Sequence, residues 1–150
     1  ILQKCTEIGV SAFVPMITSR SLVQKPDEVA NKYPRWQKII REAAEQSHRG
    51  IIPNLEPVQF FSEIVNNRLT SDTAGLIFWE EEHQTRLKKL MEGISNQQFN
   101  LMVGPEGGFT PDEVSLAQQA GYKSVSLGKR SLRLETAALF AAGLVIFELE

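Results

Sequence analysis

The sequence predicts an α/β domain in which helices flank a mostly parallel sheet. Strand-like segments alternate with helical segments along the chain, and the strand-like segments at 75–79 and 99–103 carry apolar residues on both faces. Such strands are typical of parallel sheets that helices cover on both sides. Neither an internal repeat nor a linker divides the chain, so we expect residues 1–150 to form one domain.

The composition excludes several classes of protein. With 42% hydrophobic and 23% charged residues and a net charge of −2, the chain is neither disordered nor fibrous. Its single cysteine, Cys5, excludes a disulfide framework and a cysteine-rich metal site, and favours a reducing, cytoplasmic setting. The longest apolar run, 137–147, is about half of a membrane span of roughly 20 residues, so we expect a buried helix.

Residues 2–8 resemble the end of a secondary-structure element that began earlier in the chain. We therefore expect the sequence to be a domain cut from a longer protein. Gly9 closes this element, a strand is expected over 10–17, and a loop over 18–25. Pro34 suits the first turn of a helix, whose apolar stripe is Trp36, Ile39, Ile40, Ala43 and Ala44. On its polar face, Lys38–Glu42 and Arg41–Glu45 are spaced as ion pairs. A weaker helix is expected over 60–69.

The second half contains the clearest boundary signals. A helix over 85–91 with a stop at Gly93 separates the two apolar strands. The turn at 104–109 leads into a helix with Thr110 at the N-cap, Pro111 at the first position and an acid at the third, and Gly121 ends it. A short strand over 124–127, an irregular basic segment over 128–134 and a nearly all-apolar helix over 135–149 complete the chain.

Three unusual loops follow predicted strands, at 80–82, 104–109 and 127–136. Open α/β sheets bind ligands at the carboxyl ends of their strands, so these loops are the predicted site. The turn at 104–108 is neither G-x-G-x-x-G nor a phosphate-binding loop with its lysine, which disfavours a dinucleotide or triphosphate. A plain tight turn between strand and helix is the alternative interpretation.

The loop at 127–137 is the most unusual segment. Arg133 and Glu135 stand at the start of an apolar helix, where a charge is costly unless it is paired or functional. A helix cap by Glu135 is the alternative. His48 and His83 have no partner at metal-ligand spacing, so no metal is expected. The first third of the chain has a local charge of +3, which fits either a nucleic-acid patch or a solvated face.

Three motifs together resemble the RsmE family, the small-subunit ribosomal RNA methyltransferases of the SPOUT superfamily. They are 42–49 (EAAEQSHR), 104–109 (GPEGGF) and 127–137 (LGKRSLRLETA), and the resemblance spans about residues 6–150. The chain differs at His48, where the family usually has glycine, and at Ser131, where it often has isoleucine. We expect no counterpart of the family's N-terminal PUA-like barrel within residues 1–150.

The resemblance implies a SPOUT-type sheet with a C-terminal trefoil knot, a homodimer, S-adenosylmethionine as cofactor and methylation of N3 of a uridine in 16S ribosomal RNA. Arg133 is expected to stabilise the anion that develops on uridine, and Glu106 is a candidate base or loop organiser. The expected cofactor-binding residues are Phe78, Val103, Gly104, Pro105, Glu106, Gly107, Gly108, Leu127, Gly128, Leu132, Arg133, Thr136 and Ala137. The expected RNA-binding residues are Arg20, Arg41, Gln46 and Arg49.

The apolar helix over 137–147 is expected to meet a second subunit, with Ala138, Ala141, Ala142 and Gly143 allowing close approach; cover by the knot alone is the alternative. Two other functions stay open at this point. One is a non-catalytic RNA-binding module with the same fold, which the retained loops disfavour. The other is a flavodoxin-like nucleotide-binding domain, which the missing phosphate-binding residues disfavour.

Overall fold

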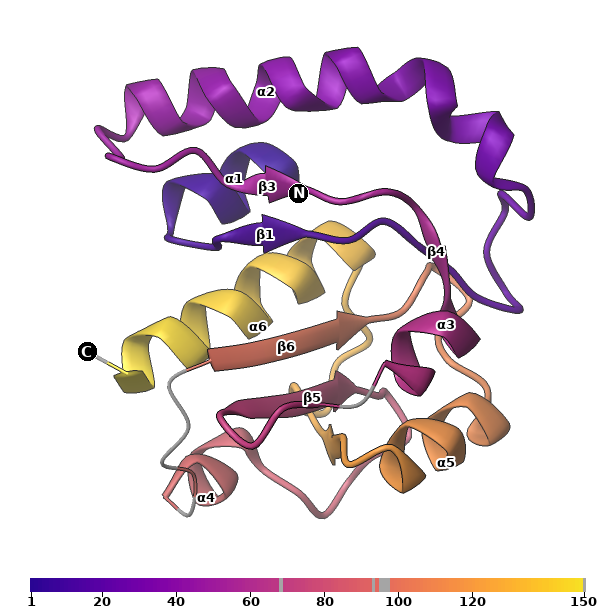
Figure 1. Ribbon diagram of the computed structural model, residues 1–150. Coiled ribbons are helices and arrows are strands. Elements are labelled where there is room, and N and C mark those ends of the chain that lie inside the picture. Colours follow the sequence, from indigo (N-terminus) through magenta and orange to yellow (C-terminus); the bar gives the residue numbers. More distant parts are fainter. Residues whose placement is uncertain (68, 93, 95–97, 150) are drawn as a thin grey trace.

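A three-stranded parallel sheet forms the centre of the C-terminal two thirds of the chain. The computed structural model describes residues 1–67, 69–92, 94 and 98–149. The strands are β5 (Thr73–Phe78), β6 (Gln98–Val103) and β7 (Lys123–Val125), in the order β6-β5-β7 (Figure 1). Parallel neighbours need crossover connections, and these contain α4 (Leu87–Met91) and α5 (Pro111–Gln119). The predicted α/β architecture with a parallel sheet is therefore confirmed.

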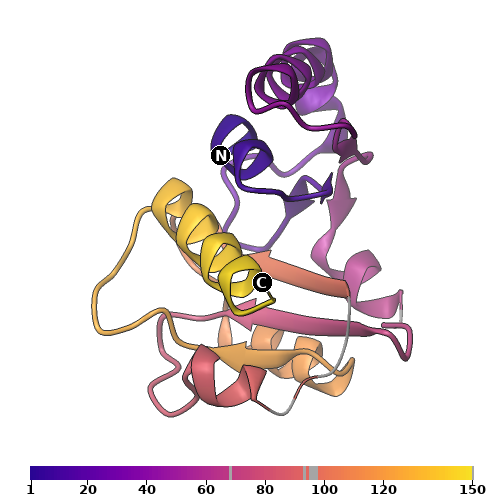
Figure 2. The ribbon, with the colours of Figure 1, turned by 90° about the vertical axis from the view of Figure 1, so that its left-hand side faces the viewer.

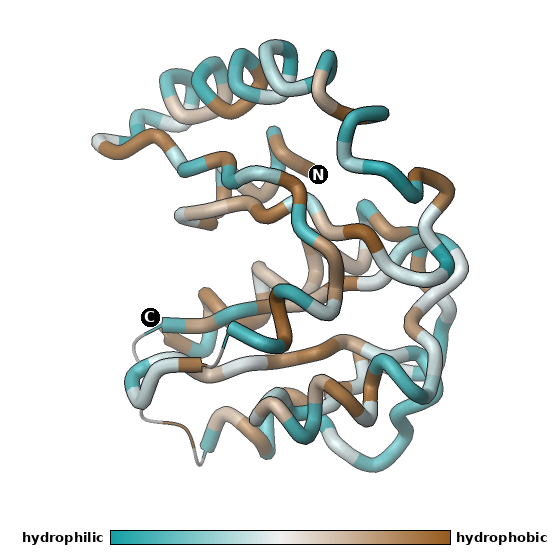
Figure 3. The backbone as a smooth tube through the Cα atoms, turned by 45° about the vertical axis from the view of Figure 1, so that its right-hand side comes forward, coloured by the Kyte–Doolittle hydropathy of each residue, from teal (hydrophilic) through white to brown (hydrophobic). Residues whose placement is uncertain are grey.

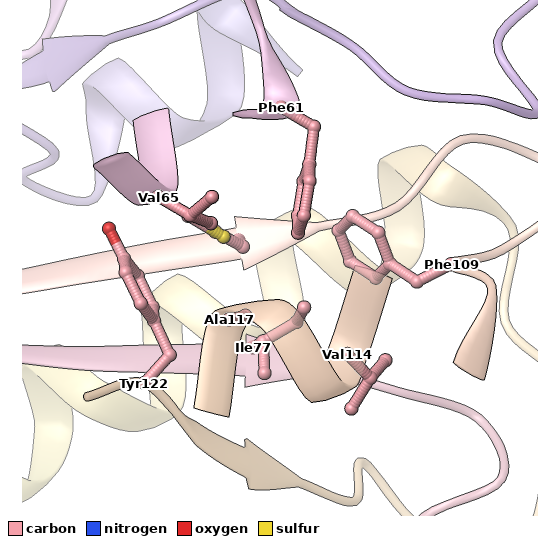
Figure 4. Packing of buried hydrophobic residues seen from close by; sticks show 8 residues of the cluster. Phe61, Val65, Ile77, Phe109, Val114, Ala117 and Tyr122 are labelled. Carbon is pink, nitrogen blue, oxygen red and sulfur yellow. The ribbon is translucent and has the colours of Figure 1, made fainter. Parts of the chain in front are cut away.

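Helices cover both faces of this sheet. Successive side chains of a strand point to opposite faces, so Ile77 faces one side while Leu76 and Phe78 face the other. On the first side, α3 (Phe61–Asn66) and α5 enclose a hydrophobic core. In this core the rings of Phe61 and Phe109 point toward each other, with 5.7 Å between their centroids (Figure 4). On the second side, α4 and α6 (Leu134–Leu149) pack against the strands (Figure 2).

A smaller N-terminal layer sits beside this sheet. Its elements are α1 (Leu2–Glu7), β1 (Ala12–Phe13), β2 (Met16–Ile17), the 3₁₀ helix Pro26–Lys32, α2 (Tyr33–Gln46), β3 (Asn54–Leu55) and β4 (Gln59–Phe60). Two short parallel pairs join β1 to β3 and β2 to β4, and α1 packs against both α2 and α6.

The amphipathic helix α2 is confirmed. Its residues Ile40, Ala43 and Ala44 are buried, and the tube of Figure 3 alternates between hydrophilic and hydrophobic turns along it. Lys38 and Glu42 form the predicted ion pair, with 3.6 Å between nitrogen and oxygen. The predicted Arg41–Glu45 pair does not form among the described residues.

Some predicted boundaries were wrong. The single strand expected over 10–17 is two short pieces separated at Pro15, because proline has no N–H to donate to a sheet. The 3₁₀ helix Pro26–Lys32 lies in a segment for which no element was predicted, and α3 ends at Asn66, earlier than expected. Helix α4 starts at Leu87, because Arg86 before it is extended and pairs with Ser126 in an isolated bridge beyond β7. The predicted stop at Gly93 lies outside the described residues.

The turn after α2 shows why the RsmE family usually has glycine where this chain has His48. His48 has a φ of +55°, in the left-handed region that favours glycine. A glycine at this position would adopt the same turn without strain.

Candidate active site

The three strands of the central sheet end in register. Phe78 at the end of β5 pairs with Val103 on β6 and with Val125 on β7. The loops that follow therefore leave the same edge of the sheet, where open α/β sheets bind ligands. The predicted convergence of the three loops is present in the structure.

A pocket opens at this edge and draws its walls from all three loops and from the start of α6. Most of the predicted cofactor residues line it, namely Phe78, Val103, Gly104, Pro105, Glu106, Gly108, Leu127, Leu132 and Ala137. The predicted residues that do not line it are Gly107, Gly128, Arg133 and Thr136. Six further residues line it that were not named individually as cofactor-binding, and all but the first lie in the predicted loops: Trp79, Glu80, Phe109, Arg130, Ser131 and Leu134.

The missed residues are direct neighbours in sequence of the predicted ones. Trp79 and Glu80 follow Phe78 at the end of β5, and Phe109 follows the glycine-rich turn. The sequence signal that could have identified them is their position directly after a predicted strand or turn. Which side chains of an irregular loop turn inward depends on how the loop is anchored.

The glycine-rich turn is held by local and distant contacts. The N–H of Gly108 donates to the carbonyl of Pro105 at 2.8 Å, and Gly108 has a φ of +67°. A Cβ at Gly104 would come within 3.2 Å of the Phe109 ring, so this glycine lets the turn fold back onto the core. Gly107 faces Arg20 rather than the pocket, and a Cβ there would lie 3.1 Å from Cβ of Arg20.

The loop after β2 forms hydrogen bonds with the glycine-rich turn and with the start of α5. Nη1 of Arg20 donates to the Gly107 carbonyl at 2.8 Å, and the N–H of Ser19 donates to the Glu113 carboxylate at 2.9 Å. Glu113 also completes the predicted capping box with Thr110. Burial raises the pKa of Glu113, but the hydrogen bonds from Ser19 and Thr110 outweigh this effect and keep the pKa below its ordinary value.

A second anchor joins the loop after β5 to β7. The Ser124 hydroxyl donates to the Glu82 carboxylate at 2.6 Å, and the N–H groups of Gln84 and Thr85 donate to the same carboxylate. These hydrogen bonds, led by that of Ser124, lower the pKa of Glu82. Gln118 of α5 donates to Ser124, so one network connects the helix, the strand and the loop.

The basic loop between β7 and α6 bows outward in Figure 2 and is anchored mainly at its ends. At its start, the N–H of Ser126 donates to the carbonyl of Thr85; at its end, the N–H of Ala137 donates to the carbonyl of Arg133. Arg130 contributes to the pocket wall, whereas the exposed Arg133 does not. The pocket thus combines apolar walls with the carboxylates of Glu80 and Glu106 and one guanidinium group.

The predicted RNA-binding residues have different surroundings. Arg41 and Gln46 are exposed on α2 without a hydrogen-bond partner among the described residues. Arg20 donates one N–H to the carbonyl of Gly107, and the residue is exposed. Arg49 donates to the carbonyls of Thr6, Gly9 and Val10, at the end of α1. Arg49 therefore holds the end of α1, which is a structural role.

Other reactive groups lie outside the pocket. Cys5 is buried on α1, and burial raises the pKa of its thiol, which disfavours the reactive thiolate. Within the part of the chain that the structure describes, no cluster of three or more histidine, cysteine or acidic side chains could hold a metal ion. In the same residues, no helix is long and apolar enough to cross a membrane.

Comparison with known proteins gives one consistent result. The model of the RNA methyltransferase domain family matches residues 1–146. Ribosomal RNA small subunit methyltransferase E of Synechocystis is 42% identical over 147 residues, covering 94% of this chain and 46% of the relative. The Bacillus subtilis enzyme of the same name is 34% identical, covering all of this chain and 60% of the relative. The chain thus spans about half the length of these relatives.

Solved structures of similar fold are methyltransferases as well. A Neisseria gonorrhoeae ribosomal RNA small subunit methyltransferase E bound to S-adenosyl methionine superposes with a TM-score of 0.84 at 35% identity, over 99% of this chain and 59% of that one. A Legionella pneumophila methyltransferase in complex with the same cofactor gives a TM-score of 0.85 at 32% identity, over 96% and 58%. With the family match over nearly its whole length and the RsmE motifs at 42–49, 104–109 and 127–137, the chain belongs to the RNA methyltransferase domain family of RsmE.

Proposed function

We propose that this chain is the catalytic domain of a methyltransferase that uses S-adenosylmethionine to methylate N3 of a uridine in 16S ribosomal RNA. The observation that carries the proposal is the pocket where the three loops converge, two of which contain RsmE motifs. The Neisseria and Legionella relatives were solved with this cofactor, which supports the assignment. We infer a cytoplasmic location, because the RNA substrate is there.

The residues of the pocket fit such a cofactor. Phe78, Val103, Leu127 and Leu132 offer apolar surface for an adenine ring, and Gly104 and Gly108 leave backbone exposed to a ligand. The carboxylates of Glu80 and Glu106 make the pocket electrostatically negative, which suits a cofactor with a net positive charge. When bound, the cofactor supplies a methyl group on a positively charged sulfur.

The chain's own residues must prepare the uridine. Neutral N3 carries a proton and is a poor nucleophile, so a base must take that proton while another group stabilises the anion on the ring oxygens. Glu106 at the pocket is the proposed proton acceptor. Arg133 is the proposed anion-stabilising group, and Arg130 on the pocket wall is placed to share this role.

A homodimer and a C-terminal trefoil knot belong to the same proposal. Helix α6 leaves Leu139, Phe140, Phe147 and Leu149 exposed, an apolar surface that a second subunit would cover. Ala141 and Ala142, which were expected at the interface, are instead buried within the chain. A crystal structure with the chain traced through residues 79–134 would test the knot.

Light scattering would test the dimer. We expect about twice the chain mass of 16.8 kDa for the wild type and the single mass for Phe140→Glu. A monomeric wild type that still transferred methyl groups would contradict the dimer.

The activity is tested in two steps. Isothermal titration calorimetry with S-adenosylmethionine should show binding at one site per chain. Transfer of a labelled methyl group to small ribosomal subunits, followed by primer extension, should then give a stop at one uridine, because N3-methylation blocks base pairing. Binding without transfer would favour the non-catalytic RNA-binding module, and no binding would refute the proposed function.

A further inference from the structure

The acidic residues around the pocket differ in how their carboxylates are used. Those of Glu82 and Glu113 each accept hydrogen bonds from backbone N–H groups, and these bonds fix the surrounding loops. Glu80 lines the pocket, and its carboxylate has no hydrogen bond or ion pair within the part of the chain that the structure describes. A carboxylate can only accept hydrogen bonds, so its partners at Glu80 must be water or a ligand.

The position of the Glu80 carboxylate depends on Gly108. A Cβ built on Gly108 would lie 2.7 Å from Oε1 of Glu80 and 3.4 Å from its Cδ, closer than real Cβ atoms approach an oxygen. The absence of a side chain at Gly108 therefore provides the space in which the carboxylate rests against the backbone of the glycine-rich turn. The end of β5 and this turn together place one acidic group at the edge of the pocket.

The rest of the pocket is mainly apolar. Besides Glu80, the charged side chains of its lining are Glu106 and Arg130. Glu80 and Glu106 are both exposed residues, but only the carboxylate of Glu80 occupies space that a Cβ on a neighbouring glycine would fill. An adenosyl group that fills an apolar pocket still carries two adjacent ribose hydroxyls, which need acceptors when they leave water. The two oxygens of one carboxylate match two neighbouring O–H donors.

We propose that Glu80 is a cofactor-binding residue that accepts hydrogen bonds from the ribose hydroxyls of the cofactor, in a position that Gly108 makes available. The proposal rests on the proposed function, since it assumes an adenosyl cofactor in this pocket. It separates Glu80, as a binding group, from Glu106, as the proton acceptor.

The test is calorimetric titration with two probes that lack the sulfonium and the amino acid. These are 5′-methylthioadenosine and its 2′-deoxy analogue. For the wild type, loss of the 2′-hydroxyl should weaken binding about tenfold, the effect of one hydrogen bond to a charged group. Glu80→Gln should weaken 5′-methylthioadenosine by a similar factor. Because both changes remove the same interaction, their combination should cost little more than either alone.

Glu81→Gln is the matched control. Glu81 is the next residue of the same loop, is exposed and does not line the pocket, so this variant should bind both probes like the wild type. Glu80→Gln should also unfold at the wild-type temperature, because the carboxylate has no partner in the described part of the protein.

Two results would overturn the role of Glu80. One is unchanged binding of 5′-methylthioadenosine by Glu80→Gln. The other is an equal loss for both probes, which would show that the residue does not contact the 2′-hydroxyl. Normal probe binding with slowed, pH-shifted methyl transfer would instead make Glu80 a proton acceptor and overturn the proposal. A wild type that binds neither S-adenosylmethionine nor the probes would refute the proposed function itself.

Discussion

Arg49 closes the end of α1 from the end of α2, and replacing it should destabilise the fold before it affects any ligand. Its Nη1 donates to the carbonyls of Thr6 at 3.0 Å and Val10 at 2.6 Å, and Nη2 donates to Gly9 at 3.3 Å. Carbonyls at a helix end have no partner within the helix. In Arg49→Gln, the shorter side chain cannot reach all three of them.

The expected loss follows from these contacts. A hydrogen bond from a charged donor contributes about 1.5–3 kcal/mol when it is well shielded. The Arg49 side chain is half-buried, one of the three bonds is long, and water can replace part of the set. We therefore expect a loss of about 2 kcal/mol in the free energy of unfolding. For a domain of this size that lowers the melting temperature by about 4–8 °C.

Urea denaturation and thermal unfolding followed by circular dichroism would measure this loss. Arg41→Gln is the control, because Arg41 lies on the same helix, is exposed and has no partner among the described residues. It should change the unfolding free energy by less than about 0.5 kcal/mol. If both variants were equally stable and Arg49→Gln lost only RNA affinity, Arg49 would be a surface RNA contact and the structural argument would be wrong.

Three further predictions concern single residues. Ser124→Ala should raise the pKa of Glu82, measured by NMR titration of its side-chain carboxyl. Because the folded pKa of Glu82 is lowered, its stabilisation is present above the unfolded value of about 4.3 and is lost as the pH falls through the folded value; the variant should therefore show a smaller acid-dependent loss of stability between pH 5 and 3. His48→Gly should raise the free energy of unfolding by about 0.5–1 kcal/mol in urea, because it relieves a left-handed residue at some entropic cost; a destabilised variant would contradict this. Gly75→Ala should lose about 1–3 kcal/mol, because its Cβ would lie 2.7 Å from the Tyr122 ring inside the core, and an unchanged urea midpoint would show that the core yields without cost.

Much of the fold followed from local patterns. The stripe of α2, the capping box of Thr110 and Glu113 and the apolar strands β5 and β6 were predicted near their observed bounds. These signals depend on helical or strand periodicity and on side chains that bond to their own backbone, so a short stretch of sequence contains them. Short elements were less predictable, because two-residue strands exist only through their partners in the sheet.

For the candidate site, the sequence predicted the loops but not the roles of the individual side chains. Its loops were predicted because each follows a strand and carries glycines or charges at unusual density. The roles of individual side chains within them were not. Arg20 and Gly107 were expected at the RNA and the cofactor, yet they contact each other across 87 positions of sequence. Glu80 and Arg130 were not singled out, although both line the pocket.

The sequence by itself determined the α/β class, the family and the edge of the sheet where the site lies, because these depend on patterns within short segments and on motifs at fixed spacing. Only the tertiary structure decided which charged groups are free. Glu82, Glu113 and Arg49 bond to the chain's own backbone, whereas the carboxylate of Glu80 faces the pocket without a partner among the described residues. Every one of these side chains is polar and could have lain in either environment. The difference arises because backbone groups outside the helices and strands need partners, and the folded arrangement decides which side chains reach them.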